Sequence, residues 1–364
     1  MIPTPTEMTN NRVARVREEM LKRGLDAFFV SSLFNIRYLT GFTGSNAILI
    51  ITEKSSIFLS DIRYKLQAKQ EVTNCRRTIF TKFGLYEETS RRQLLDGAEK
   101  VGFESQQITY AQYRTLRRLF PHTSFVSTSD IVEEVLLVKD DHEVEMIRRA
   151  VGISDKVFDD VLKVIRVGVR ELEVAAEISY LHKSLGAERD AFETIVASGE
   201  RSALPHARAT EKKIKAGELL TLDFGCVVNG YNSDITRTIA IGKTSIRAKR
   251  MYDVVREAQQ EAIESAKGGI WAKDLDAVAR KRIERLGYGK YFNHSLGHGL
   301  GLHVHERPKV SQLSKERLRS GSVITIEPGV YLPKFGGVRI EDDVLLTESG
   351  CVVLNKATKE FIVI

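Results

Sequence analysis

Two aspartates on a predicted β-hairpin have types and a spacing that could do chemistry. Asn229-Gly230 separates two β-prone runs, and this dipeptide is the strongest short signal for a two-residue hairpin turn. With such a turn, Asp223 lies opposite Thr236, and Asp234 becomes the diagonal neighbour of Asp223 on the same face. Two carboxylates in this position repel each other, and a cation between them removes the repulsion. The pair by itself fits either a metal site or a solvated surface hairpin.

The other face of this hairpin is expected to pack in a hydrophobic core. Side chains alternate between the two faces of a strand, so the apolar residues fall opposite the aspartates. These residues are Leu220, Leu222, Phe224, Ile235, Ile239 and Ile241. A three-residue loop would reverse one strand and separate the two acids.

A glycine-rich segment, residues 294–306, contains half of the histidines of the chain: His294, His298, His303 and His305. Glycines on both sides of His298 allow a close approach of the backbone. The segment lacks the spacing of a dinucleotide-binding loop, and no histidine follows His305-Glu306 at the distance of a zincin motif. A loop of structural histidines is the alternative interpretation.

Two glutamates next to β-prone runs complete a candidate metal-binding set. Glu327 ends one run before a Pro-Gly turn, and Glu341 follows another. Either glutamate alone could be a solvated acid at the end of a strand. The full set comprises Asp223, Asp234, His298, Glu327 and Glu341. Four carboxylates with one imidazole suit Mn, Co or Zn, and their charge would neutralise two divalent ions, so we expect a two-metal centre.

The composition is that of a globular protein. The 364 residues correspond to about two domains, and 42% of them are hydrophobic and 28% charged. The apolar runs are far shorter than the roughly 18 residues of a membrane-spanning helix, so no membrane association is expected. The net charge of +7 comes from dispersed basic pairs, which argues against nucleic-acid binding. Three scattered cysteines and a polar N-terminal segment without a signal-peptide core predict a cytoplasmic protein.

The pattern of elements changes part-way along the chain. Residues 1–132 alternate short helical and apolar runs, which predicts a small α/β domain. In this part we expect helices at about 11–23 and 85–100 and strands at 27–30, 47–51 and 56–59. Residues 133–364 place helices before antiparallel hairpins, which predicts an α+β domain that carries the candidate site. Its helices are expected at about 139–165, 171–185, 246–267 and 272–286.

The segments that carry these residues resemble the prolidase and aminopeptidase P family of metallopeptidases. The resemblance rests on the Asp223 to Asp234 segment, Gly297-His-Gly-Leu-Gly-Leu with His305-Glu306, Glu327-Pro-Gly, Arg339-Ile-Glu-Asp, and Tyr38-Leu-Thr-Gly-Phe-Thr-Gly in the first part. It covers nearly the whole chain. It implies an overall α+β architecture, in which a C-terminal pita-bread catalytic domain follows a smaller α/β N-terminal domain of the creatinase/prolidase type.

The resemblance also implies a role for each candidate ligand. Asp223 would chelate one metal ion, and His298 and Glu327 would chelate the other. Asp234 and Glu341 would bridge the two ions. Manganese is the metal expected first, with cobalt or zinc as alternatives.

Further active-site residues follow from the same resemblance. His206 and His305 match two histidines that act on the substrate, and Arg339 matches a residue near the substrate or the ligands. Glu327 would also pass a proton to the leaving proline nitrogen. The catalytic residues are therefore expected to be His206, His305 and Glu327, and the substrate-binding residues His206, His305 and Arg339.

The implied activity is hydrolysis of the Xaa-Pro bond at the N-terminus of short peptides, by a hydroxide held between the metal ions, in a homodimer. One position departs from the family, because Lys309 stands where many dipeptidases carry an arginine that holds the substrate carboxylate. Lysine is a point charge and not a two-pronged donor, so the choice between dipeptides and longer peptides stays open, and Arg307 could substitute. The alternatives are a metal-free creatinase-like hydrolase and a non-catalytic binding protein on the same fold, both of which lose the ligand set.

Overall fold

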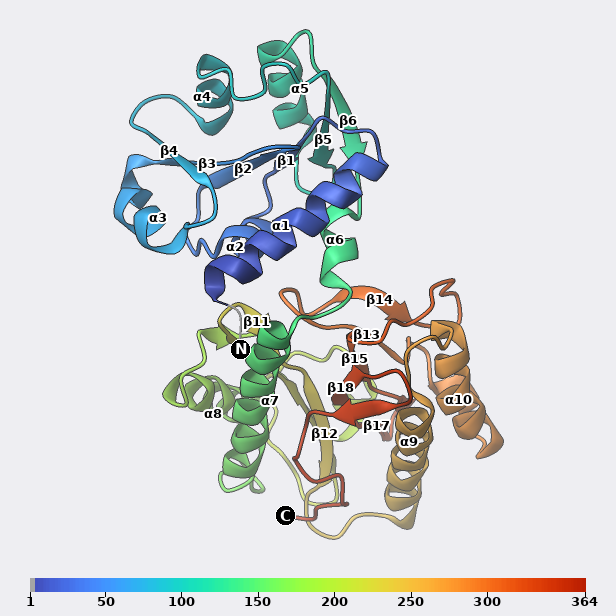
Figure 1. Cartoon of the computed structure of the whole chain (residues 1–364). Coiled ribbons are helices and arrows are strands. Elements are labelled where there is room, and N and C mark those ends of the chain that lie inside the picture. The colour runs from blue at the N-terminus through green and yellow to red at the C-terminus, as the bar shows by residue number, and fades with distance from the viewer. Residues whose placement is uncertain (1–3) are drawn as a thin grey trace. The chain divides into compact units, whose positions relative to one another are not determined.

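The chain forms two compact units, Met1–Leu136 and Leu137–Ile364 (Figure 1). The computed structural model describes residues 4–364. A division after residue 132 would fall inside helix α6 (Ile131–Leu136), where Val132 and Val135 are buried. The first unit therefore extends to the end of that helix.

A six-stranded mixed sheet forms the centre of the N-terminal unit, in the order β4-β3-β2-β1-β5-β6. Its strands are β1 (Ala27–Val30), β2 (Ala47–Thr52), β3 (Ser56–Asp61), β4 (Arg76–Phe80), β5 (Lys100–Glu104) and β6 (Ser124–Thr128). β1, β5 and β6 run parallel, whereas β2 is antiparallel to both of its neighbours. The three predicted strands are confirmed as β1, β2 and β3.

The helices of this unit agree only partly with the prediction. They are α1 (Pro5–Lys22), α2 (Leu33–Thr40), α3 (Lys65–Glu71), α4 (Leu85–Arg91), α5 (Tyr110–Leu119) and α6. α1 begins earlier than expected because Thr4 and Glu7 exchange hydrogen bonds in a capping box. The predicted helix 85–100 is wrong beyond Arg91. Gln93 takes a left-handed conformation with φ of 53°, and the chain turns there so that Leu94 and Leu95 are buried.

The four helices predicted for the C-terminal unit are confirmed, with ends that differ by a few residues. They are α7 (Asp141–Val161), α8 (Glu171–Ser184), α9 (Ile246–Ser265) and α10 (Ala272–Arg285). Two short 3₁₀ helices, η2 (Gly199–Ala203) after β8 and η3 (Gly289–Tyr291) after α10, also belong to this unit. Within residues 4–364, no helix combines the length and the apolar character that a membrane crossing requires.

The strands of the C-terminal unit form several small antiparallel sheets. β12-β9-β8 and β11-β10-β7 are three-stranded, β14-β13-β15-β18-β19 is five-stranded, and β16 pairs with β17. Their bounds are β7 (Arg189–Asp190), β8 (Ile195–Ser198), β9 (Leu219–Phe224), β10 (Cys226–Val228), β11 (Tyr231–Asn232), β12 (Ile235–Ala240), β13 (Gly297–Gly299), β14 (Glu306–Val310), β15 (Val323–Ile326), β16 (Gly329–Leu332), β17 (Gly336–Arg339), β18 (Asp342–Leu346) and β19 (Cys351–Val353).

The hairpin around Asn229-Gly230 has the predicted register. Val228 pairs with Tyr231, and Asp223 pairs with Thr236. The six apolar residues expected on the opposite face lie in one buried cluster with side chains of α7 and α8. A second cluster places α9 and α10 against β15 and β18. The unit therefore has two halves, one in which α7 and α8 pack on β9 and β12, and one in which α9 and α10 pack on β15 and β18. Figure 1 shows α7 and α9 on opposite sides of the strands.

A buried guanidinium joins these two halves. Arg237 on β12 is the largest side chain that is fully buried among residues 4–364. Its Nη2 lies 2.7 Å from Oδ1 of Asp342 on β18 and donates to the carbonyl of Ala357 at 2.8 Å. Nε donates to the carbonyl of Thr358 at 3.0 Å, and Nη1 donates to the carbonyl of Glu341. The side chain thereby fixes β12 against β18 and the C-terminal segment.

Replacing Arg237 with methionine should therefore destabilise the C-terminal unit by about 3–5 kcal/mol, because buried carbonyls and Asp342 lose their partner. Urea denaturation followed by the fluorescence of Trp271 measures this effect. Trp271 is the single tryptophan of the chain and belongs to the C-terminal unit.

Arg256→Met is the matched control. Arg256 pairs with Glu360 at 3.0 Å, but the two side chains are 36% and 80% exposed. Such a pair contributes less than about 1 kcal/mol. Equal effects of the two substitutions would contradict the role given to Arg237.

Candidate metal centre

Four of the predicted ligands converge in the C-terminal unit. Asp234, His298 and Glu341 each offer a ligand atom, and these atoms lie within 4.8 Å of one another. Nε2 of His298 is 3.7 Å from Oδ2 of Asp234 and 3.4 Å from Oε1 of Glu327. Residues that are far apart in the sequence thus surround a common point.

Asp223 joins this group through two connections. Its strand partner Thr236 donates from Oγ1 to Oε2 of Glu341 at 2.5 Å and accepts the backbone N–H of Glu341 at 3.1 Å. Arg339 donates to Oδ2 of Asp223, and its Nε lies 4.0 Å from Oε2 of Glu327. All five predicted ligands therefore belong to one cluster.

Strand register explains why the two glutamates face the same way. On β15 and β18, Thr325 pairs with Asp343 and Ile326 pairs with Asp342, so the next positions are Glu327 and Glu341. Side chains alternate, which puts both glutamates on the face that also carries Thr325 and Asp343. The backbone N–H of His298 donates to Oγ1 of Thr325 at 3.2 Å, which fixes β13 beside them.

The glycines that flank His298 are required by close packing. A Cβ atom added at Gly297 would lie 2.0 Å from the carbonyl oxygen of Thr325, and one added at Gly299 would lie 2.1 Å from that of Arg307. The predicted close approach of the backbone is confirmed. It lets β13 fit between β14 and β15 and so positions His298.

The carboxylates of this cluster are held in an unfavourable electrostatic environment. Burial, followed by the charges of neighbouring carboxylates, raises the pKa of Asp234 and of Glu341. Burial also raises the pKa of Glu327 to about 8. Oδ1 of Asp223 and Oδ1 of Asp234 are buried without a hydrogen-bond partner. Hard divalent cations prefer oxygen donors of this kind, and they would remove both the repulsion and the unsatisfied oxygens.

His298 has the geometry of a metal-ligating histidine. Nδ1 lies 3.1 Å from the carbonyl oxygen of Gly299, so a proton on Nδ1 leaves the lone pair of Nε2 directed at Asp234 and Glu327. Burial, followed by the nearby His305, lowers the pKa of His298 to about 4. The imidazole is therefore neutral at pH 7, as a metal ligand must be. The donor set as a whole fits divalent metal ions.

The two histidines predicted to act on substrate lie beside this cluster. The ring of His305 is 4.4 Å from the ring of His298 between centroids, and its side chain reaches solvent. Burial, followed by the charge of His206, lowers the pKa of His305. His206 follows Pro205, whose carbonyl accepts from Arg339 at 3.1 Å. His206 is also exposed. Both imidazoles can reach a molecule that enters from solvent.

Arg339 is instead buried among protein groups. Besides Asp223, its guanidinium donates to the hydroxyl of Tyr331 at 2.7 Å and to the carbonyl of Pro205 at 3.1 Å. The predicted contact of Arg339 with substrate stays a prediction. Its observed contacts place it as the support of Asp223.

A hydrogen-bonded chain behind the ligands was not predicted from the sequence. Nε2 of His294 lies 2.9 Å from the hydroxyl of Tyr331, which in turn bonds to Arg339 and so connects to Asp223. The sequence does indicate one supporting residue. Thr236 lies two positions after Asp234, and alternate residues of a strand lie on the same face, so its hydroxyl is expected beside the ligands.

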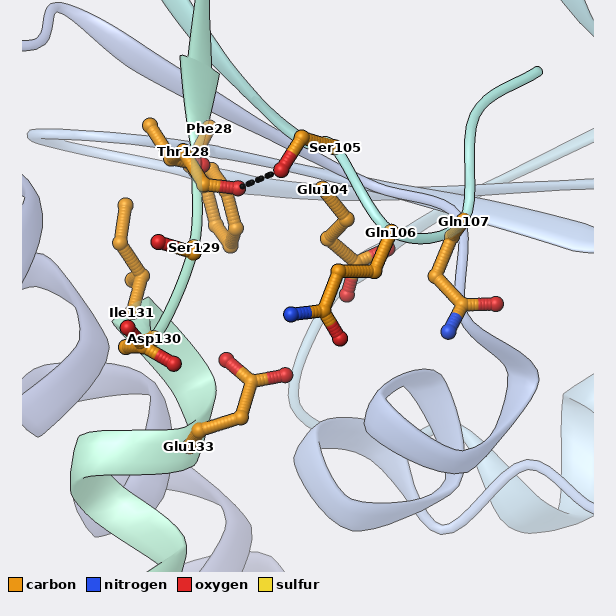
Figure 2. Close-up of a pocket in the computed structure, with 10 residues that line it drawn as sticks. All are labelled: Phe28, Glu104, Ser105, Gln106, Gln107, Thr128, Ser129, Asp130, Ile131 and Glu133. Atoms are coloured by element: carbon orange, nitrogen blue, oxygen red, sulfur yellow. Dashed lines mark hydrogen bonds between the residues drawn. The ribbon is translucent and has the colours of Figure 1, made fainter. Parts of the chain in front are cut away.

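The N-terminal unit contains a small pocket that is unrelated to these residues (Figure 2). Glu104 lines it together with Asp130 and Glu133. The carboxylate of Glu104 accepts the backbone N–H groups of Ser31 and Ser32, both at 2.6 Å, at the start of α2. Glu104 thus fixes the two residues that precede α2, and Ser32 itself caps the helix by accepting the backbone N–H of Asn35.

Comparison with known proteins identifies the family. Residues 145–348 match the model of metallopeptidase family M24, and residues 12–137 match the creatinase/prolidase N-terminal domain. The chain belongs to metallopeptidase family M24. The predicted family and the predicted fold, a creatinase/prolidase-type domain followed by a pita-bread domain, are confirmed.

Relatives of this M24 chain match it over its full length. A Xaa-Pro dipeptidase of Pyrococcus horikoshii is 41% identical over 358 residues, which cover 98% of this chain and 100% of that protein. The solved structure of a Xaa-Pro dipeptidase from Bacillus anthracis aligns with a TM-score of 0.95 at 38% identity, covering 98% of this chain and 100% of that one. An X-Pro aminopeptidase from Thermotoga maritima aligns with a TM-score of 0.89 at 37% identity, covering 95% of this chain and 100% of that one. The M24 family consists of metallopeptidases, which agrees with a centre built for divalent metal ions.

Binding of Mn²⁺ to the metal-free M24 protein at pH 7 should release protons, on the order of one per chain. The raised pKa values keep a fraction of the carboxyl groups of Asp234, Glu327 and Glu341 protonated, and only ionised carboxylates bind the metal. The release should become smaller as the pH rises toward 9. Calorimetric titration in buffers of different ionisation enthalpy measures the number of protons. A binding enthalpy that is the same in every buffer would contradict this account.

Proposed function

We propose that this chain hydrolyses the Xaa-Pro bond at the N-terminus of short peptides with two divalent metal ions. The observation that carries the proposal is the convergence of three carboxylates and one imidazole, from Asp234, Glu327, Glu341 and His298, in a single buried cluster. The full-length similarity to enzymes that are named Xaa-Pro dipeptidase or X-Pro aminopeptidase supports the substrate class.

Each ligand has a proposed place. Asp223 would hold one ion, His298 and Glu327 would hold the other, and Asp234 and Glu341 would be shared between them. The unpartnered Oδ1 atoms of Asp223 and Asp234 support this assignment. Arg339 donates to Oδ2 of Asp223, and Thr236 donates to Oε2 of Glu341. These hydrogen bonds would orient the two carboxylates so that their other oxygens face the ions.

The residues of the chain then act on the peptide. Divalent ions held here would supply a nucleophilic hydroxide at neutral pH and polarise the scissile carbonyl. His206 and His305 donate hydrogen bonds to the substrate and to the charge that develops on the carbonyl oxygen, a contribution of about 3 kcal/mol per donor. Glu327 takes up the proton that the attacking water releases and passes it to the proline nitrogen. That nitrogen is a poor leaving group without protonation, so an acid at this position promotes cleavage.

Lys309 is the proposed partner of the substrate carboxylate. It pairs with His298 across β13 and β14, so both side chains lie on the same face of the sheet, and Lys309 is exposed. Arg307 is the weaker candidate, because its Nε donates to Oε1 of Glu316 at 2.8 Å. A lysine next to the metal-binding cluster supports a preference for dipeptides, whose carboxylate follows the scissile bond directly.

The proposal also covers the metal, the assembly and the compartment. Manganese is proposed as the native metal, with cobalt or zinc as alternatives, and the chain is proposed to act as a homodimer. Cys75, Cys226 and Cys351 are free thiols, which supports a reducing cytoplasmic location.

A peptide panel tests the reaction. Purified protein is assayed on Xaa-Pro dipeptides, tripeptides that begin with Xaa-Pro, and matched peptides without proline, each with Mn²⁺, Co²⁺ or Zn²⁺ and after chelation. We expect cleavage of the proline peptides only with metal, and loss of cleavage in Asp234→Asn. Equal turnover of the peptides without proline would rule out the proline specificity, and full activity after chelation would rule out the metal mechanism.

Lys309→Met should raise the KM for a Xaa-Pro dipeptide about tenfold or more, because a charge-assisted hydrogen bond worth about 1.5–3 kcal/mol is lost. The KM for the corresponding Xaa-Pro amide, which lacks the carboxylate, should not change.

Lys309→Arg should restore dipeptide binding, and Lys315→Met, at an exposed lysine nearby, is the control. An equal loss on the dipeptide and on its amide would show that Lys309 does not contact the carboxylate.

A further inference from the structure

Glu171, in the first turn of α8, has a fully buried carboxylate that accepts five hydrogen bonds. Oε1 accepts from the backbone N–H of Ser198 at 2.9 Å and from its hydroxyl at 2.8 Å. Oε2 accepts from Nε of Arg201 at 3.0 Å and from the backbone N–H and the hydroxyl of Thr210 at 3.2 and 2.8 Å. A buried carboxylate with this many donors holds them strongly in place.

The donors bracket the segment that carries His206. Ser198 is the last residue of β8, Arg201 lies in η2, and Thr210 follows the irregular stretch after η2. One carboxylate therefore binds both ends of residues 198–210. The exposed imidazole of His206 extends from the segment between them.

The far side of the same segment is attached to the metal-binding half of the unit. The hydroxyl of Ser202 accepts the backbone N–H of Gly337 at 2.8 Å. The carbonyl of Pro205 accepts from Nη1 of Arg339, and Nη2 of the same guanidinium donates to Asp223. The position of His206 relative to the ligands thus depends on anchors at both the base and the tip of the segment.

Glu171 does not cap its own helix. In α8 that task falls to Glu173, whose carboxylate accepts the backbone N–H of Arg170 at 2.8 Å. Every hydrogen bond to the Glu171 carboxylate given above comes instead from residues 198–210. Its placement is therefore best explained by the segment that it holds.

We propose that Glu171 is a positioning residue that holds the 198–210 segment, and with it His206, in place for the substrate. The inference rests on the proposed function, in which His206 contacts the peptide. Glu171→Gln tests it, because the amide replaces one acceptor oxygen with a donor that faces other donors. Glu173→Gln, the same change at an exposed position of the same helix, is the matched control.

The experiment compares Glu171→Gln, Glu173→Gln, His206→Ala and the double variant Glu171→Gln/His206→Ala, all loaded with Mn²⁺. We expect kcat/KM for a Xaa-Pro dipeptide to fall on the order of ten- to a hundredfold in Glu171→Gln. The double variant should be no worse than His206→Ala alone, because both changes remove the same contribution. Mn²⁺ affinity and the activity of Glu173→Gln should be unchanged.

Hydrogen exchange separates failure of this inference from failure of the proposed function. In Glu171→Gln, exchange should become faster across 198–210 and stay unchanged in β12 and β15, whether or not the protein cleaves peptides. If Glu171→Gln does not fold, Thr210→Val and Ser198→Ala, which remove single donors, should give smaller effects in the same direction. Unchanged exchange in 198–210, or losses that multiply in the double variant, would overturn the inference.

Discussion

The centre is governed by the mutual repulsion of carboxylates that the fold buries side by side. Burial raises the pKa values of Asp234, Glu341 and Asp343, and their neighbours' charges raise them further. Arg339 places its guanidinium against Asp223, but this leaves an excess of negative charge around His298. Binding of divalent ions removes that excess and therefore stabilises the folded state by mass action. Metal affinity and the stability of this part of the chain are consequently coupled.

The sequence could predict this cluster to the extent that local rules determine it. The Asn229-Gly230 turn fixes the hairpin register, and alternation then puts Asp223 and Asp234 on one face. The pairing of β13 with β15, and of β15 with β18, joins segments that no short turn connects, so their proximity had to come from the family resemblance. The hydrogen bond between Tyr331 and Arg339 also depends on long-range pairing. A single tyrosine in an apolar run of the sequence does not predict it.

The error in the N-terminal unit has a different physical origin. The residues after Arg91 have helical spacing, but Gln93 takes a left-handed conformation and breaks the helix. Leu94 and Leu95 reach the core of the sheet only because the chain turns there, so burial outweighs local helix preference. Helix α1 begins earlier than its apolar spacing indicates because Thr4 and Glu7 form a capping box, a pattern that can be recognised in the sequence. Tertiary packing and short capping contacts thus shift helix ends that periodicity alone places only approximately.

The five proposed ligands and the two histidines proposed to bind substrate are positioned by different means. The ligands lie on or directly beside paired strands, where register fixes them to one another. His206 and His305 lie on loops, so their positions depend on side-chain anchors. Near His305, the carboxylate of Glu306 accepts the backbone N–H of His303 at 2.9 Å and pairs with the buried Lys139 at 2.9 Å. A buried carboxylate therefore anchors each histidine loop, Glu171 for one and Glu306 for the other. Because these anchors lie outside the proposed ligand set, a substitution at an anchor should move its histidine more than the strands that carry the ligands, although β14 and Arg339 connect the two groups.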